Sequence, residues 1–263
     1  MTTSKPRLGV FKFSSCDGCQ LSVLDSEEEL LDLADRMDIV LFHEAQTNFG
    51  PGPYDVALVE GSVTTQAEIE RSRAIRAQTR VFVAFGVCAT HGGLQALKNY
   101  ADVEEYKRIV YPKPDLVTSL PTSKPHHDYV KVDFELQGCP PNRHQLMMVI
   151  SQLLLGRTPS VSTNSVCVEC KRRGNVCVLV ARNLPCMGPV THDGCGALCP
   201  SLDRDCYACF GPMDDPKTVR FAEELRMRGL SPLDIVHRFR EITPNPDFFN
   251  KGAERYEREA DQS

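Results

Sequence analysis

Cysteine is the residue type in this sequence that is best suited to do chemistry. The chain of 263 residues contains 12 cysteines. Four of them are spread over residues 1–166, and the other eight fall between Cys167 and Cys209. A chain of this length does not need disulfide bonds in order to fold, so this many thiols indicates metal binding or redox chemistry. The uneven distribution also predicts two domains, residues 1–160 and residues 161–263.

The four early cysteines all follow strand-like segments. Cys16 and Cys19 lie in SSCDGCQ, Cys88 lies in GVCATHGG, and Cys139 lies in LQGCPPN. Parallel sheets bind ligands just beyond the carboxyl ends of their strands, so we expect these thiols to meet at one edge of a sheet. Four thiolates are the ligand number of a 4Fe–4S cluster. Two other interpretations remain open: a thioredoxin-type redox pair made by Cys16 and Cys19, or buried cysteines that act as small hydrophobic side chains.

The eight later cysteines form a dense module with two runs of four. The first run is Cys167, Cys170, Cys177 and Cys186, and the second run is Cys195, Cys199, Cys206 and Cys209. Little periodicity follows residue 161, so we expect a loop-rich module in which bound metal supplies much of the stability. Two iron–sulfur clusters and two structural zinc ions both fit this number of thiols. The spacing leaves the identity of the metal open.

The elements that position the early thiols alternate between strands and helices. Continuous β-branched runs predict strands, and amphipathic stretches predict helices. The predicted strands are 8–13, 38–42, 54–59, 80–85 and 130–136, and the predicted helices are 20–35, 64–77 and 142–155. Thr64 or Thr65 suits the N-cap of the second helix. This alternation is typical of an α/β fold with a doubly wound parallel sheet.

The composition excludes several classes of protein. Hydrophobic residues make up 41% of the chain and charged residues 25%, which is typical of a globular protein and not of a disordered one. The formal charge of −5 gives no basic field that would attract nucleic acid. The longest apolar runs have about ten residues, which is too short for a membrane span. The first residues show no signal region, so we expect a cytoplasmic protein.

Taken together, the cysteine motifs resemble one protein family. The segments SSCDGCQ, GVCATHGG, GCPPN, LPCMGPVTHDGCGALCP and DCYACFGP span about residues 7–213. In this order they resemble the small subunit of [NiFe] hydrogenases, and in particular the cytoplasmic multimeric class of sulfhydrogenase and NAD(P)-linked enzymes. The resemblance implies a flavodoxin-like domain followed by a cysteine-dense iron–sulfur module. It also implies a separate large subunit that holds the Ni–Fe site.

The resemblance implies three 4Fe–4S clusters, each held by four cysteines of this sequence. The proximal cluster would be held by Cys16, Cys19, Cys88 and Cys139. The medial cluster would be held by Cys195, Cys199, Cys206 and Cys209. The distal cluster would be held by Cys167, Cys170, Cys177 and Cys186. Membrane-bound hydrogenases have a histidine in place of Cys167 and lack Cys199, so this chain resembles a class in which all three clusters are of the 4Fe–4S type.

The implied function is electron transfer within an oxidoreductase that acts on H2. The large subunit would carry the catalytic site, and this chain would pass electrons to a flavin-containing NAD(P) reductase subunit, in a complex that also holds further iron–sulfur subunits. Two alternatives remain. The chain could be a zinc-stabilised structural or adaptor subunit of a redox complex, or a hydrogenase-related subunit that serves another acceptor such as polysulfide.

Several other polar residues have ordinary interpretations from the sequence. His126 and His127 follow a proline-rich stretch and are predicted to lie in an exposed loop. His192 lies between cysteines, but eight thiols are already available there as ligands. Glu60 follows a strand, where it can orient groups near the first four thiols or face a partner protein. The basic run 171–173 is either a solvated turn or a docking site for an acidic electron-accepting subunit.

Overall fold

The computed structural model describes residues 5–262, which form two compact units with their boundary between Ser160 and Val161. Unit 1 is an α/β domain. Its strands are β1 (Arg7–Lys12), β2 (Asp38–Phe42), β3 (Tyr54–Glu60), β4 (Thr79–Phe85) and β5 (Phe134–Leu136). Its helices are α1 (Gly18–Leu24), α2 (Glu27–Arg36), α3 (Gln66–Ala77), α4 (Val87–His91), α5 (Val103–Val110) and α6 (Arg143–Leu154), with 3-10 turns η1 (Leu94–Tyr100), η2 (Pro114–Leu116) and η3 (His126–Asp128).

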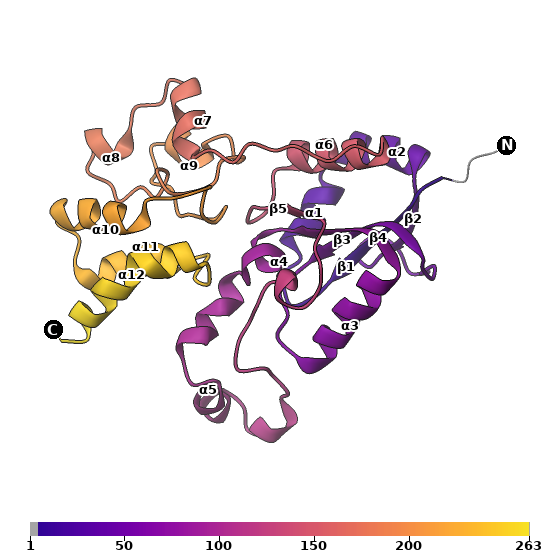
Figure 1. Cartoon of the computed structure of the whole chain (residues 1–263), viewed down its shortest axis with the longest axis horizontal. Coiled ribbons are helices and arrows are strands. Elements are labelled where there is room, and N and C mark those ends of the chain that lie inside the picture. Colours follow the sequence, from indigo (N-terminus) through magenta and orange to yellow (C-terminus); the bar gives the residue numbers. More distant parts are fainter. Residues whose placement is uncertain (1–4, 263) are drawn as a thin grey trace. The chain divides into compact units, whose positions relative to one another are not determined.

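The five strands of unit 1 pair in parallel in the order β2-β1-β3-β4-β5. This order is that of flavodoxin-like folds, in which the direction of winding reverses between β1 and β3. Helices α2 and α6 cover one face of the sheet and α3 covers the other (Figure 1). Because both faces are covered, the strands read as continuous apolar runs, and Val10, Ala57 and Val83 are fully buried. The predicted doubly wound α/β sheet is confirmed.

Helix α3 shows how local sequence sets the start of an element. The side chain of Thr65 accepts a hydrogen bond from the backbone N–H of Glu68, and the Glu68 carboxylate accepts one from the N–H of Thr65. This reciprocal arrangement is a capping box, which satisfies two backbone donors that the first turn leaves free. Of the two predicted candidates, Thr65 is therefore the N-cap.

Two predicted elements of unit 1 differ from those observed. The predicted helix 20–35 is two helices, because the chain turns at Ser26, whose buried hydroxyl donates to the Ser22 carbonyl oxygen at 3.1 Å. The predicted strand 130–136 begins only at Phe134. Just before it, the Asp133 backbone N–H donates to the Phe82 carbonyl oxygen at 2.9 Å, but the Phe82 N–H donates to the Asp133 carboxylate at 2.8 Å, so a side chain supplies one of the two hydrogen bonds at this point.

His126 was predicted to lie in an exposed loop, and that prediction is wrong. The residue is fully buried, and its ring meets the Phe13 ring edge-on at 4.5 Å between centroids. Its Nε2–H donates to the Gly61 carbonyl oxygen at 3.1 Å, and its Nδ1 accepts from the Ser72 hydroxyl at 2.9 Å. The proline-rich composition indicated a loop, but it did not indicate that the loop folds back onto α3. His127 next to it is half-exposed.

Unit 2 combines a loop-rich cysteine region with three longer helices. The cysteine region contains the short helices α7 (Val166–Arg172), α8 (Val178–Ala181) and α9 (Leu198–Ser201). The longer helices, which the sequence did not predict, are α10 (Thr218–Met227), α11 (Pro232–Arg240) and α12 (Asp247–Ala260). Among residues 5–262, the structure has no helix that is both long and apolar enough to cross a membrane.

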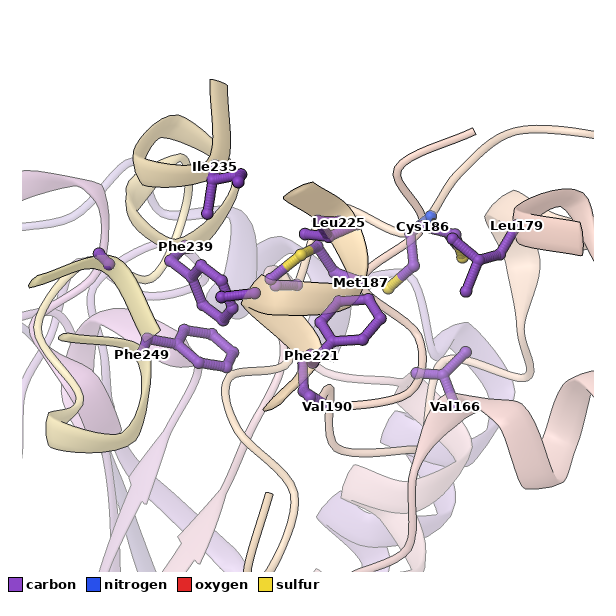
Figure 2. Close-up of a cluster of buried hydrophobic side chains, with 14 of the residues drawn as sticks. Val166, Leu179, Cys186, Met187, Val190, Phe221, Leu225, Ile235, Phe239 and Phe249 are labelled. Atoms are coloured by element: carbon purple, nitrogen blue, oxygen red, sulfur yellow. Dashed lines mark hydrogen bonds between the residues drawn. The ribbon is translucent and has the colours of Figure 1, made fainter. Parts of the chain in front are cut away.

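The longer helices give unit 2 a hydrophobic core of its own. Phe239 and Phe249 are buried with their rings 5.8 Å apart, and Phe221 belongs to the same cluster. The core reaches the cysteine region, because Met187 and Cys186 are buried in it (Figure 2). Packing of aromatic side chains therefore stabilises this unit in addition to any bound metal.

Candidate metal centres

The first candidate site lies at the carboxyl edge of the sheet in unit 1. Cys16 follows β1, Cys19 lies in α1, Cys88 lies in α4 after β4, and Cys139 follows β5. The four thiols are close enough for the charge of Cys19 to interact with those of the other three. The structure thus brings together four residues that are up to 123 positions apart in the sequence (139 − 16). A set of four thiols is the donor set that a 4Fe–4S cluster requires.

The strands that carry these thiols are not all neighbours, because β3 lies between β1 and β4. Helix α1 bridges this gap. The Cys19 N–H donates to Oε1 of Glu60 at the end of β3, at 3.3 Å. The Cys19 thiol then reaches Gly86 at the end of β4, where an added Cβ would lie 2.2 Å from the sulfur. Gly86 has φ +85°, so both its backbone and this close approach require glycine.

Gln95 is a residue of this site that sequence reasoning missed. The Cys88 thiol donates to Oε1 of Gln95 at 3.3 Å, and Nε2 of Gln95 donates to the Ser14 carbonyl oxygen at 2.9 Å. One side chain therefore joins the thiol that follows β4 to the loop that follows β1. The only signal in the sequence is its place just after the Gly-Gly pair. At Gly93 an added Cβ would lie 2.4 Å from the Cys88 sulfur.

The electrostatics of the first site disfavour free thiolates. Burial raises the pKa of Cys19 well above its usual range, and it raises the pKa of Cys88 to about 12. A thioredoxin-type pair requires the opposite, a nucleophilic cysteine whose pKa is lowered. Thiols of this kind become thiolates when a bound metal compensates their charge. The environment thus fits a cluster site better than it fits a reactive thiol pair.

The second candidate site is a hollow in unit 2. Its lining includes Cys167 and Cys170 from α7, Cys177 at the N-cap of α8, and Cys186. The other lining residues are apolar or glycine: Val166, Val178, Leu179, Gly188, Pro189 and Pro200. The hollow is partly open to solvent, and its volume is small, about 30 Å³ for the centre of a water-sized sphere. Four thiols with an apolar surround again fit a metal cluster, and burial raises the pKa of Cys167 to about 11.

In the structure, the remaining cysteines of unit 2 lie near one another as two pairs. The charge of Cys195 interacts with that of Cys199, and the charge of Cys206 interacts with that of Cys209. The Cys206 N–H also donates to the Cys186 sulfur at 3.3 Å, which links this set to the second site. Burial raises the pKa of both Cys195 and Cys206.

Glu169 and His192 hold the loops around these cysteines. The carboxylate of Glu169, between Cys167 and Cys170 in α7, accepts hydrogen bonds from the N–H groups of Gly194 and Ala197, at 3.1 and 3.2 Å. Nδ1–H of His192 donates to the Asp193 carbonyl oxygen at 2.6 Å, and the ring is buried. In the described chain, no three His, Cys, Asp or Glu side chains gather closely enough to hold a single metal ion.

Comparison with known proteins agrees with this geometry. Residues 16–153 match the family model described as NADH ubiquinone oxidoreductase, 20 Kd subunit. The chain is 38% identical to sulfhydrogenase 2 subunit delta of Pyrococcus furiosus, over 84% of this chain and 92% of that protein. It is 31% identical to a subunit of the vhu F420-non-reducing hydrogenase of Methanocaldococcus jannaschii, over 81% of this chain and 84% of that protein.

Among solved structures, a chain from the NAD+-reducing [NiFe]-hydrogenase in the H2-reduced state matches with a TM-score of 0.55 and 32% identity. The match covers 60% of this chain and 96% of that chain. The flavodoxin-like sheet, the gathered thiols and these similarities lead to one assignment. The chain belongs to the NADH ubiquinone oxidoreductase 20 Kd subunit family and, within it, to the small subunits of multimeric [NiFe] hydrogenases.

Proposed function

We propose that this chain relays electrons between the Ni–Fe site of a large subunit and a flavin-containing NAD(P) reductase partner, through three 4Fe–4S clusters, in the cytoplasm. The observation that carries this proposal is the meeting of four distant thiols at the carboxyl edge of a flavodoxin-like sheet. The match to a chain of an NAD+-reducing hydrogenase supports the choice of electron acceptor.

We assign one set of four thiols to each of the three clusters. The proximal set is Cys16, Cys19, Cys88 and Cys139. The distal set is Cys167, Cys170, Cys177 and Cys186. The medial set is Cys195, Cys199, Cys206 and Cys209. A bound iron–sulfur cluster supplies one-electron transfer at a potential that its surroundings tune.

The chain's own residues would set the surroundings of each cluster. At the proximal set, Glu60 fixes the Cys19 backbone, and Gln95 fixes the Cys88 thiol. At the distal set, the lining residues other than the thiols are apolar or glycine, so a bound cluster would have few polar neighbours there. Hydrogen bonds to sulfur and exclusion of water both tune the potential of such a group.

The apolar surface of unit 1 supports an obligate complex with the large subunit. Segment 94–116, which follows Cys88, exposes several large apolar side chains, among them Leu94, Ile109 and Leu116. Many exposed large apolar side chains in one segment are typical of a protein interface. The same segment contains no cysteine, so we assign it to subunit contact and not to electron transfer.

The decisive experiment is metal analysis of the anaerobically purified complex, with low-temperature EPR after reduction by H2. We expect about twelve irons per copy of this chain, after subtraction of the iron in other subunits, since three 4Fe–4S clusters contain that number. Signals that appear under H2 would connect these irons to hydrogen oxidation. Two zinc ions with about four irons would instead make the cysteine module of unit 2 structural.

Cysteine variants test which residues hold the proximal cluster. Cys16→Ser and Cys139→Ser should each abolish H2-linked electron transfer, while the clusters of unit 2 still assemble. Full activity in either variant would disprove the proximal assignment. If the intact complex reduced polysulfide and not NAD(P), the electron-transfer role of this chain would stand, but its electron-accepting partner would be a different subunit.

A further inference from the structure

We propose that the surface of unit 2 around Cys177, formed by residues 171–182 and 198–204, docks an acidic face of the electron-accepting protein. We call this region the Cys177 surface. The inference rests on the proposed function, since it assigns the place where electrons leave the chain and the charge of the partner that takes them.

Hydrogen bonds and an ion pair hold the two segments of the Cys177 surface together. The hydroxyl of Ser201 accepts hydrogen bonds from Nη1 of Arg173 at 3.1 Å and from Nδ2 of Asn175 at 3.0 Å. Nη2 of Arg182 lies 2.8 Å from Oδ2 of Asp203. The end of α7, helix α8 and the end of α9 therefore form one continuous surface.

The centre of this surface is apolar. Val176, Val180 and Leu202 are 65%, 72% and 69% exposed. A single exposed side chain of this type is common, whereas three of them on one surface are typical of an interaction site. An apolar centre with a polar rim is the usual arrangement of a protein interface.

The rim of the surface is basic. The two segments contain a single carboxylate, Asp203, and five cations, all of them exposed: Lys171, Arg172, Arg173, Arg182 and Arg204. The whole chain has the opposite balance, with a formal charge of −5. A local positive field on an acidic protein attracts an acidic surface and increases the rate of productive encounter. Charge complementarity thus identifies the partner's face as acidic.

The Cys177 surface is continuous with the second candidate site. Cys170 and Cys177 both line the hollow, and Cys177 is exposed on the surface between Val176 and α8. Cys186 is buried at the hydrophobic core of unit 2. A redox group bound in the hollow would therefore lie within reach of a protein docked at Cys177, which is the requirement for electron exit.

The test uses the complex of the full chain with its large subunit, reduced by H2, with two acceptors: a small dye and an acidic two-iron ferredoxin as the protein probe. Wild type should reduce ferredoxin more slowly as NaCl rises, because salt screens the attraction. The double variant Lys171→Glu/Arg172→Glu should lower the low-salt rate constant for ferredoxin at least about tenfold and remove its salt dependence. Reduction of the dye should be unchanged.

The matched control is Lys251→Glu/Arg258→Glu, which makes the same change of charge at two cations of α12. Helix α12 lies apart from α7 and α9 (Figure 1). This variant should leave both rates unchanged, and an equal loss in both double variants would overturn the proposal, because net charge alone would then explain the effect.

Two more outcomes would also overturn it. One is dye reduction by wild type without salt-sensitive reduction of ferredoxin. The other is wild-type binding to phosphatidylserine vesicles that the Lys171→Glu/Arg172→Glu variant loses, since the surface would then recognise a membrane. Failure of the wild-type complex to reduce even the dye would count against the proposed function and is thus distinguishable from failure at this surface.

Discussion

The backbone N–H of Cys19 donates a hydrogen bond to Oε1 of Glu60 at 3.3 Å, and the Glu60 side chain is fully buried. This contact joins the helix that follows β1 to the end of β3, across the point where the sheet reverses its winding. Burial raises the pKa of Glu60. The Glu60 carboxylate thus positions the backbone of Cys19, and it does so at a place that solvent does not reach.

Replacement of Glu60 should separate the role of this hydrogen bond from that of the charge. In Glu60→Ala the buried Cys19 N–H loses its acceptor, which costs about 1–3 kcal/mol. We expect a lower thermal unfolding midpoint and loss of iron from unit 1. Glu60→Gln keeps an acceptor oxygen and should retain the iron. Equal iron loss in the two variants would show that the charge, and not the hydrogen bond, is required.

Gly86 and Gly156 offer a matched pair for a test of the first site. Both have positive φ, +85° and +67°, so alanine strains the backbone at each. An added Cβ meets the Cys19 sulfur at 2.2 Å at Gly86, whereas nothing lies within 4 Å at Gly156. Gly86→Ala should therefore lose about a third of the iron of this chain, one cluster of three. Gly156→Ala should keep all of it, as measured by metal analysis.

The sheet and the four early thiols could be predicted from the sequence because their signals are local. Strands covered on both faces are continuous apolar runs, and a parallel sheet places their carboxyl ends at one edge. Cys16 and Cys139 could thus be assigned to one place before any contact between them was known. That β3 separates β1 from β4 agrees with the flavodoxin-like fold that the resemblance implied, but it could not be predicted from the strand pattern alone, because strand order depends on which helices pack on which face.

The buried position of His126 and the packing of the helices of unit 2 could not be predicted, for a different reason. His126 is buried through contacts with Ser72 and Gly61, more than 50 positions away in the sequence. Helix α12 carries many Arg and Glu residues, and its apolar stripe is only as wide as Phe249, Ala253 and Tyr256. These apolar residues recur at helical spacing, which is a clear periodic signal for α12 itself, whereas the contact of Phe249 with Phe239 depends on tertiary packing.

The burial of His126 predicts a loss of stability in mild acid. Burial lowers its pKa from 6.5 to about 4, so the unfolded chain binds a proton between these values that the folded chain does not. The free energy of unfolding should therefore fall as pH drops below about 6.5, by about 2 kcal/mol between pH 7 and pH 5. In His126→Gln, the thermal unfolding midpoint should fall less between pH 7 and pH 5 than it does in wild type.

His127 is the control for this pH effect. Its hydrogen bond to Glu135 raises its pKa, so its contribution to stability is present at low pH and is lost as pH rises. His127→Gln should keep the fall in acid that His126 causes and make it slightly steeper, because the opposing contribution of His127 at low pH is lost. The assignment to His126 would fail if both variants showed the same dependence of the midpoint on pH.

Phe249 tests whether the core of unit 2 is stabilised by packing as well as by its cysteines. Phe249 is fully buried against Phe239, whereas its neighbour Phe248 is 41% exposed. Phe249→Ala should cost about 3–5 kcal/mol, because the core cannot close around the lost ring. Phe248→Ala removes the same atoms from a half-solvated position and should cost about 1 kcal/mol or less. The measurement is the unfolding midpoint of the metal-loaded complex, followed by cluster absorbance. If metal binding alone stabilised this unit, the two variants would lose their absorbance at the same temperature as wild type.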